Sequence, residues 1–366
     1  GRTYLYASRF GVGGFDEYRV FNNGIFKFKG TVHDTPWRVL GDVTALHATS
    51  LHGIDMFFAA SALDGGMHSH LLGTWGATSI VDRFIPYVGD QFAAPQDIEA
   101  VQIAERAFVL MASAQSDTIS VVRVSQAGMM KLVDEEEDTL HTRFEGVHEI
   151  EVFEAGGRVF VVAAGSDDGI TLFELNYRGR LVHLESVRDE FFTTLADVSS
   201  LEVFVDGETA HIYAGSSAEH GVTELIVDLS RSGEVVRGGP VPEVLHATRG
   251  DDVIWGMGRS DELFGGAGAD RLVDGRGRDT LTGGPGPDVF EFIPDGRTDW
   301  ILDFEPGVDL IDLSNFDRVD HPDSVFLGDR INGAVIIVGE DIIRLTNPEG
   351  GRWYLEDFKD GMFIFG

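Results

Sequence analysis

Short apolar segments that end in small residues recur about every fifty residues through the first 246 residues of the chain. They are YLYAS (4–8), FFAAS (57–61), VLMAS (109–113), VVAAGS (161–166) and HIYAGS (211–216). After each comes a turn and a second segment in which apolar and polar positions alternate, as in TISVVRVSQAG (118–128). This alternation predicts β-strands, because successive side chains of a strand point to opposite faces of the sheet.

Further strand-like segments bring the total to about four short strands in each unit of fifty residues. Those that lead units two to five are VTALH (43–47), IEAVQI (98–103), HEIEVF (148–153) and SLEVF (200–204). Four short strands joined by turns are typical of a propeller blade, whereas an immunoglobulin-like sandwich needs about 100 residues per copy. The pattern therefore predicts a β-propeller of about five blades over residues 1–246.

The first of these units has no leading strand of its own. The segment PEVLHAT (242–248) shares the letters LHAT with VTALHAT (43–49) in the second unit. We expect this late segment to complete the first blade and close the ring, which would remove two exposed sheet edges.

A second and much shorter period begins near residue 250. Aspartates recur every nine residues, at Asp252, Asp261, Asp270, Asp279 and Asp288. An apolar residue lies two positions after each of them, at Ile254, Leu263, Leu272, Leu281 and Phe290. Glycine lies two positions before four of them, at Gly250, Gly268, Gly277 and Gly286. This is the G-G-x-G-x-D-x-U-x nonapeptide of calcium-binding parallel β-helices.

The residue types of the repeat suit a calcium site. Glycine reaches backbone angles in a tight turn that a Cβ would forbid, and carbonyl and carboxylate oxygens are the hard ligands that Ca²⁺ prefers. Two nonapeptides complete one coil, so we expect calcium between Asp252 and Asp270, Asp270 and Asp288, and Asp261 and Asp279. The candidate metal-binding residues are Gly250, Asp252, Asp261, Gly265, Gly268, Asp270, Gly277, Asp279, Gly283, Gly286 and Asp288.

Two positions depart from the repeat. Arg259 stands where a turn glycine is expected, and Asp274 replaces the first glycine of the fourth copy. The pair formed by Asp261 and Asp279 is therefore the least secure of the expected sites.

The segment after the repeats, TDWILDFEPGVDLIDLS (298–314), closely resembles the one that follows the calcium repeats of serralysin-type and other RTX proteins. The resemblance extends over about residues 247–366. It implies an RTX β-roll over 247–291 and a C-terminal β cap over 292–366 that carries an uncleaved type I secretion signal. It also implies an extracellular protein with the type I secretion machinery as a partner. The fold class expected for the whole chain is all-β.

The composition narrows the classes of partner. The 366 residues include 61 Asp and Glu against 28 Lys and Arg, a net charge of −33, which disfavours nucleic acid and anionic membrane surfaces. No apolar run approaches the roughly 18 residues of a membrane helix. Because so much negative charge repels itself, we expect calcium binding to be coupled to folding of the C-terminal third.

The sequence contains no recognisable catalytic motif. The zinc-protease string H-E-x-x-H is absent, since Val152 stands where His148 and Glu149 would require a second histidine, and G-x-S-x-G is absent too. There is no cysteine for thiol chemistry. We exclude a zinc protease of the H-E-x-x-H type.

Two local clusters remain. His68 and His70 would face the same side of a strand and could hold a metal, but only His52 offers a third ligand, so we interpret them as surface histidines in a loop. We interpret DEEED (134–138) as a solvated acidic loop.

Three functions fit these features. The first is a secreted calcium-binding protein whose propeller binds a carbohydrate or a cell-surface component, with Trp37 and Trp75 as candidates for stacking on sugars. The second is a secreted propeller enzyme, such as a lyase, hydrolase or lactonase, which a cluster of histidine, arginine and acidic residues in the channel would favour. The third is a structural component of an extracellular array or particle.

Overall fold

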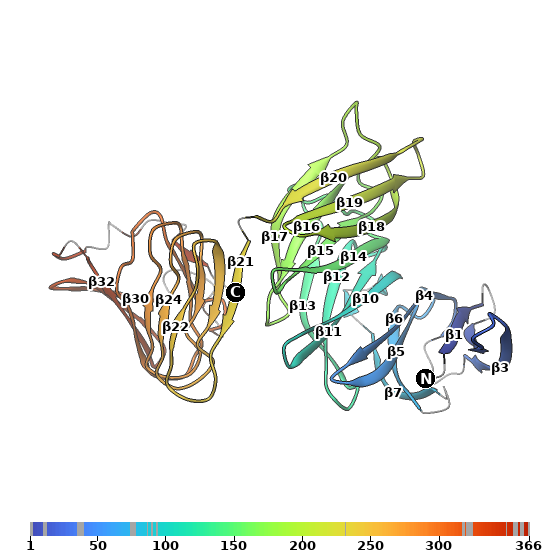
Figure 1. Cartoon of the computed structure of the whole chain (residues 1–366), viewed down its shortest axis with the longest axis horizontal. Coiled ribbons are helices and arrows are strands. Elements are labelled where there is room, and N and C mark those ends of the chain that lie inside the picture. Colours follow the sequence, from blue (N-terminus) through green and yellow to red (C-terminus); the bar gives the residue numbers. More distant parts are fainter. Residues whose placement is uncertain are drawn as a thin grey trace. The chain divides into compact units, whose positions relative to one another are not determined.

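The structure is a computed structural model that describes residues 3–9, 13–34, 40–73, 78–85, 87–88, 91–92, 94–230, 232–316, 319, 325–348, 350–353, 358 and 362–364. All regular elements within these residues are β-strands, so the expected all-β class is confirmed. The chain divides into two compact units, Gly1–Val227 and Asp228–Gly366. The two units are coloured blue to green and yellow to red in Figure 1.

The first unit is a succession of five small antiparallel sheets, as expected for propeller blades (Figure 1). The first three sheets are β1 (Thr3–Ser8), β2 (Gly14–Val20) and β3 (Phe26–His33); β4 (Val43–Leu51), β5 (Ile54–Ser61), β6 (Gly66–Leu72) and β7 (Thr78–Phe84); and β10 (Pro95–Ile103), β11 (Arg106–Ser113), β12 (Thr118–Val124) and β13 (Met130–Glu137). The fourth and fifth are β14 (Glu149–Ala155), β15 (Arg158–Ala164), β16 (Gly169–Leu175) and β17 (Leu181–Arg188); and β18 (Val198–Asp206), β19 (Thr209–Ser216) and β20 (Val222–Asp228). A two-stranded ribbon, β8 (Tyr87–Val88) with β9 (Gln91–Phe92), lies between the second and third sheets in the sequence.

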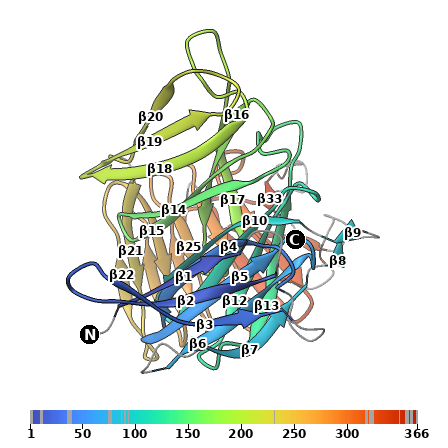
Figure 2. The ribbon, with the colours of Figure 1, turned by 90° about the vertical axis from the view of Figure 1, so that its right-hand side faces the viewer.

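The leading strand of each sheet contacts the leading strand of the next. Contacts join β1 to β4, β4 to β10, β10 to β14 and β14 to β18, which follow one another in Figure 2. Four of the five apolar segments that end in small residues are the second strands of their sheets, β5, β11, β15 and β19, whereas YLYAS forms β1, the first strand of its sheet. In β11 every residue from Ala107 to Ser113 is buried, because this sheet is covered on both faces.

The expected closing strand of the ring is wrong. β22 (Val244–His246) runs parallel to β24 (Glu262–Phe264) in the second unit, with Leu245 opposite Leu263. The likeness to the second blade was a chance sharing of letters, because Leu245 continues the apolar column that the nonapeptides build. The first and fifth sheets keep apolar side chains exposed, among them Phe26 at 57% and Phe204 at 60%.

The second unit is a parallel β-roll of two sheets. One sheet consists of β21 (Ser232–Arg237), β23 (Asp251–Trp255), β25 (Arg271–Val273), β27 (Val289–Glu291), β29 (Leu310–Asp312) and β33 (Phe363–Ile364). The other consists of β22, β24, β26 (Thr280–Thr282), β28 (Thr298–Ile301), β32 (Asp341–Thr346), β31 (Gly333–Val338) and β30 (Phe326–Arg330). The boundary expected after residue 246 thus falls inside this unit, because β21 and β22 already form rungs of the roll.

The core of the roll is a stack of single apolar side chains. The predicted inward residues Ile254, Leu263, Leu272, Leu281 and Phe290 are all fully buried. The C-terminal residues continue both sheets, since β32 pairs with β28 and β33 pairs with β29 in parallel. The roll and its cap therefore share one core.

Candidate metal centre

The turns of the roll carry two columns of aspartates. Parallel pairing sets residues eighteen apart opposite one another, as in Ile254 with Leu272. The first column is Asp252, Asp270, Asp288 and Asp309, and the second column is Asp261, Asp279 and Asp299. All seven side chains belong to residues that are no more than 3% exposed.

A ladder of hydrogen bonds runs through each column. In the first column the backbone N–H of each aspartate donates to Oδ1 of the next, over 2.8 Å from Asp252 to Asp270, 2.9 Å from Asp270 to Asp288 and 3.0 Å from Asp288 to Asp309. In the second column the same bond joins Asp261 to Asp279 over 2.7 Å and Asp279 to Asp299 over 2.9 Å. The structure therefore brings together the three aspartate pairs that the repeat predicts.

The second carboxylate oxygen of four aspartates is buried without a hydrogen-bond partner among the described residues. These atoms are Oδ2 of Asp261, Asp270, Asp279 and Asp288. A buried oxygen that carries charge is strongly unfavourable unless a partner compensates it. Four orphaned oxygens at equivalent points of a repeat are what a resident cation would require.

At the first aspartate of the first column, Oδ2 has hydrogen-bond partners within the protein. Asp252 Oδ2 accepts hydrogen bonds from the backbone N–H of Thr248 at 2.7 Å and from the Thr248 hydroxyl at 3.0 Å. At the other end, Asp309 Oδ2 accepts from the N–H of Glu305 at 2.7 Å. The unsatisfied oxygens of this column are therefore in its middle, at Asp270 and Asp288.

The turn glycines keep the space beside these oxygens open. A Cβ at Gly265 would lie 2.5 Å from Asp270 Oδ2, and one at Gly283 would come closer to Asp288 Oδ2 than the 3.0 Å that real Cβ contacts respect. Gly286 has a φ of +144°, and its Cβ would collide with the carbonyl oxygen of Gly268. Glycine is thus required here both by backbone conformation and by crowding with oxygen ligands.

Electrostatics in the columns favour a bound cation. Burial, together with repulsion from neighbouring aspartates, raises the pKa of Asp270 to about 6, of Asp279 to about 7 and of Asp288 to about 8. Carboxylates that resist ionisation in the cation-free fold become favourable again beside a dication. Hard oxygens, negative charge and an uncrowded turn fit Ca²⁺.

The second column has an additional carboxylate. Asp274, the predicted departure from the repeat, is buried, and burial followed by repulsion from Asp299 and Asp279 raises its pKa well above the ordinary value. Ligand oxygens of Asp274, Asp279 and Asp299 lie within 4.8 Å of one another, the one such metal-ligating group among the described residues. The other departure, Arg259, has a left-handed φ of +88°, which confirms that its position suits glycine.

The nine-residue period did not reveal two members of these columns, nor two residues that precede the columns in the sequence. Asp299 and Asp309 lie twenty and twenty-one residues after their partners, because extra residues interrupt the period of nine. On the other side, Glu234 and Glu243 continue the period with glutamate in place of aspartate, and their backbone N–H groups donate to Asp252 and Asp261. The apolar residues two positions later, Val236 and Leu245, would have revealed both copies.

The two other clusters are not as expected. His68 and His70 lie on strand β6 and are 1% and 0% exposed, so the interpretation as surface loop histidines is wrong. The ring of His70 packs 5.7 Å from those of Phe15 and Phe57, and the described residues offer no third ligand for a metal there. The acidic run from Asp134 to Glu137 also lies on a strand, β13, rather than in a loop. Trp37 and Trp75 lie outside the described residues.

A third polar cluster was not foreseen. Equivalent positions on four leading strands carry His47, Glu99, Glu151 and Glu202, and His47 Nδ1 lies 3.5 Å from Glu99 Oε1. Burial raises the pKa of Glu151 to about 7, and repulsion from Glu99 and Glu202 adds to the shift. Each glutamate alone had the pattern of a solvent-facing strand residue, and only the contact between blades brings them together.

The second unit is thus a parallel β-solenoid with two glycine-lined aspartate columns, each with a candidate calcium site. The RTX calcium-binding nonapeptide repeat family, in four copies, matches residues 237–272 and 256–290. The second unit therefore contains RTX calcium-binding nonapeptide repeats. No curated protein matches the chain. No helix among the described residues is long and apolar enough to cross a membrane.

The solved structures that match parts of this chain include three whose source, identity and coverage are as follows. A protein from Lactobacillus plantarum is 14% identical at a TM-score of 0.45, over 61% of this chain and 67% of its own. The periplasmic gluconolactonase PpgL of Pseudomonas aeruginosa is 16% identical at 0.45, over 59% of this chain and 61% of its own. The AlgE6R3 subunit of the Azotobacter vinelandii mannuronan C5-epimerase is 27% identical at 0.27, over 35% of this chain and 81% of its own. These likenesses are too weak to assign an activity.

Proposed function

We propose that the chain is a secreted calcium-binding protein whose C-terminal unit becomes stable when Ca²⁺ fills the two aspartate columns. The observation that carries the proposal is the set of four buried Oδ2 atoms without hydrogen-bond partners. The candidate ligands are the column aspartates, with carbonyl oxygens of the turn residues Gly250, Gly268, Gly277 and Gly286 beside them. Calcium supplies the positive charge that the crowded carboxylates need.

Binding and folding are coupled because the same residues serve both. The aspartates hold successive turns together through Oδ1 and repel one another through their charges. Without calcium, a net charge of −33 works against the compact state. In a cytosol poor in calcium the second unit would therefore stay loose enough for export by the type I secretion machinery, and it would fold outside the cell.

For the first unit we propose a binding role toward a carbohydrate or a cell-surface component. Its support is the pair Phe191 and Phe192, which are 94% and 93% exposed between β17 and β18 with ring centroids 5.1 Å apart. Aromatic side chains held outside a core are typical of binding surfaces.

The acidic cluster on the leading strands favours a second candidate, a secreted enzyme of the hydrolase, lyase or lactonase type. A carboxyl group with a pKa of about 7, as at Glu151, suits a general acid or base near neutral pH. The discriminating test is turnover of lactone and polysaccharide substrates by the full chain and by Glu151→Gln. Turnover by the full chain that Glu151→Gln abolishes would establish an enzyme. If none of the substrates is turned over, the binding role is favoured.

The calcium proposal is tested by equilibrium dialysis and circular dichroism of the full chain. After chelation with EDTA, addition of calcium should restore bound metal together with β-structure, whereas magnesium should not. A chelated protein that neither takes up calcium nor changes its spectrum would overturn the proposal.

A further inference from the structure

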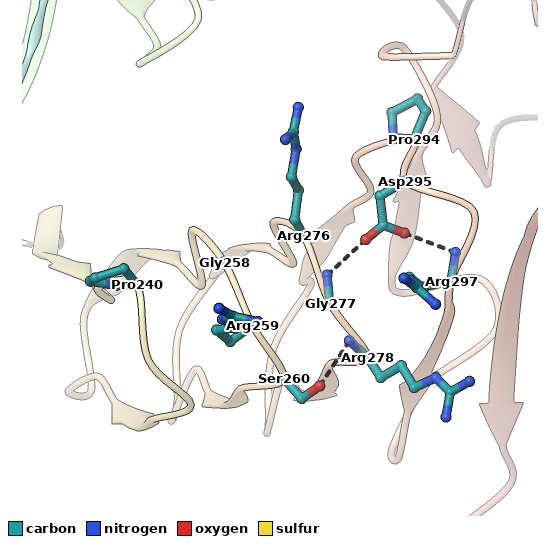
Figure 3. A pocket seen from close by; sticks show the side chains of 10 residues that line it. All are labelled: Pro240, Gly258, Arg259, Ser260, Arg276, Gly277, Arg278, Pro294, Asp295 and Arg297. Atoms are coloured by element: carbon teal, nitrogen blue, oxygen red, sulfur yellow. Dashed lines mark hydrogen bonds between the residues drawn. The ribbon is translucent and has the colours of Figure 1, made fainter.

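A hollow of about 830 Å³ lies over the turns of the second column (Figure 3). Arginines make up a large share of its lining. The lining includes Arg259, Arg276, Arg278, Arg297, Asp295 and Ser260. All four arginines are exposed.

Their guanidinium groups are not used by the fold. Among the described residues none of the four makes a side-chain hydrogen bond or ion pair, although Arg297 interacts electrostatically with Asp295. Arg271 in the same unit shows the contrast, since it pairs with Glu291 at 2.8 Å and Asp312 at 3.0 Å. In a chain with 61 acidic and 28 basic residues, four arginines without such partners in one hollow point to an anion from outside.

The arginines are concentrated in this column. Where the second column has Arg276 and Arg278, the first column carries Ala267 and Ala269, then Pro285 and Pro287, and its first turn has one arginine, Arg249, with Asp251 at the second position. Arg259 occupies a glycine position with a left-handed φ of +88°. A strained residue of this kind is typical of a functional site.

The arginines are arranged for an extended ligand. Arg259, the pair Arg276 and Arg278, and Arg297 belong to three successive turns, and rungs of a parallel sheet are about 4.8 Å apart. Figure 3 shows Arg276 and Arg278 leaving one turn in opposite directions, so their charges do not converge on a single point. A 1,4-linked sugar advances its chain by about one such rung, which lets acid groups on successive sugars meet successive turns.

Polar groups between the arginines favour hydroxyls as well as acid groups. Asp295 accepts hydrogen bonds of 2.8 Å from the backbone N–H groups of Gly277 and Arg297, which fixes a carboxylate inside the hollow (Figure 3). Ser260 Oγ accepts from the N–H of Arg278 at 3.2 Å and keeps its own hydrogen to donate. A carboxylate accepts hydrogen bonds from sugar hydroxyls, so a ligand that offers hydroxyls beside its acid groups suits the hollow better than an anion without hydroxyls.

We propose that this hollow binds a carboxylated polysaccharide, a polyuronate chain. Its carboxylates would pair with Arg259, Arg276, Arg278 and Arg297, and its hydroxyls would bind Asp295 and Ser260. The arginine, Asp295 and Ser260 side chains are not among the candidate calcium ligands, but the hollow shares the turn residue Gly277 with them, so it lies on turns that calcium would hold in place.

The test uses the full chain in calcium and short oligogalacturonides, which are too short to gel. Isothermal titration should show binding that weakens at least about tenfold in the double variant Arg276→Ser with Arg278→Ser, since two charge-assisted pairs are lost. Arg297→Ser provides a second variant on another turn and should also weaken binding. Arg249→Ser, an exposed arginine on a first-column turn, is the matched control and should change nothing.

Further ligands discriminate between classes of anion. Methyl-esterified oligogalacturonides, which lack the charge, should not bind. Unchanged affinity in both arginine variants would overturn the proposal, as would preferential binding of polyphosphate or single-stranded DNA. Calcium stoichiometry is measured separately in each variant. Loss of polyuronate binding with full calcium binding supports the proposed site in the hollow. Absence of calcium binding in the parent chain counts only against the calcium proposal.

Discussion

The backbone N–H of Asp270 donates a 2.9 Å hydrogen bond to Oδ1 of Asp288, while Oδ2 of both residues is buried without a hydrogen-bond partner among the described residues. One oxygen of each carboxylate thus holds adjacent turns together, and the other remains for a ligand. On the calcium proposal, Oδ1 therefore has a structural role and Oδ2 a metal-binding role within one side chain.

Asp270→Asn should lower calcium affinity by at least about tenfold, which is about 1.4 kcal/mol. The amide oxygen remains an acceptor for the N–H of Asp252, whereas an amide nitrogen replaces the orphaned Oδ2 and the negative charge is lost. Competition with a fluorescent chelator measures the change. Asp252→Asn is the control and should have a smaller effect, because both of its oxygens accept hydrogen bonds from the protein. Equal losses in the two variants would contradict this division of roles.

Calcium-free stability should fall as pH rises from about 4 to about 8, between the ordinary aspartate pKa and the raised pKa values of Asp270, Asp279 and Asp288. Since these folded-state values exceed the ordinary value near about 3.9, the folded state holds protons that the unfolded state releases. Their contribution is complete in acid and is lost as pH passes the folded values. Tryptophan fluorescence during thermal unfolding in EDTA measures this, because Trp255, Trp300 and Trp353 lie in the second unit. Saturating calcium should abolish the decline, and a midpoint that rises with pH in EDTA would contradict the buried-carboxylate account.

Gly286→Ala should destabilise the second unit by about 3 kcal/mol or more, through left-handed strain and a collision with the Gly268 carbonyl. Gly307→Ala is the matched control, because its φ is +85° but nothing lies within 4 Å of the added Cβ. The control should lose only about 1 kcal/mol. Denaturant unfolding in calcium measures both, and similar losses would show that crowding in the turn is unimportant.

The roll could be predicted well from the sequence because each nonapeptide repeat determines the local structure of one turn and one strand. A period of nine places Ile254, Leu272 and Phe290 in one column, and all three are fully buried. The prediction failed where the period changes, at Asp299 and Asp309, and where glutamate replaces aspartate, at Glu243.

The first unit was less predictable because the same strand pattern also occurs in the second unit and because contacts between blades are not visible in any one strand. LHAT at residues 245–248 resembled a blade strand, but parallel pairing with β24 depends on the roll as a whole. The clustering of Glu99, Glu151 and Glu202 depends on how one blade packs against the next, which no single strand encodes.

Glu151→Gln should stabilise the first unit by an amount that grows as pH rises from about 4.5 to about 7, between the ordinary and the raised pKa of this group, and that levels off above it. A folded pKa above the unfolded value costs stability once the group ionises, and the amide cannot ionise. Hydrogen exchange of strand β14 across this pH range measures the effect. Glu202→Gln, at an exposed position, should give a smaller change, and an equal change would show that burial does not set the behaviour of the cluster.

Asp274→Asn should raise the stability of the calcium-free second unit and reduce the stabilisation that calcium gives. The amide oxygen keeps the hydrogen bonds from the N–H groups of Gly275 at 2.5 Å and Ile293 at 2.9 Å, so the turn is preserved. The charge that repels Asp279 and Asp299 is removed, which relieves the calcium-free state. That same charge would attract a cation to the second column, so in the variant calcium should stabilise the second unit less than it does in the parent chain. Thermal unfolding in EDTA and in calcium measures both changes, with Asp251→Asn, a half-buried aspartate beside the first column, as the control. If the calcium-induced shift in midpoint stays at its parent value, Asp274 takes no part in binding, and its burial serves the turn alone.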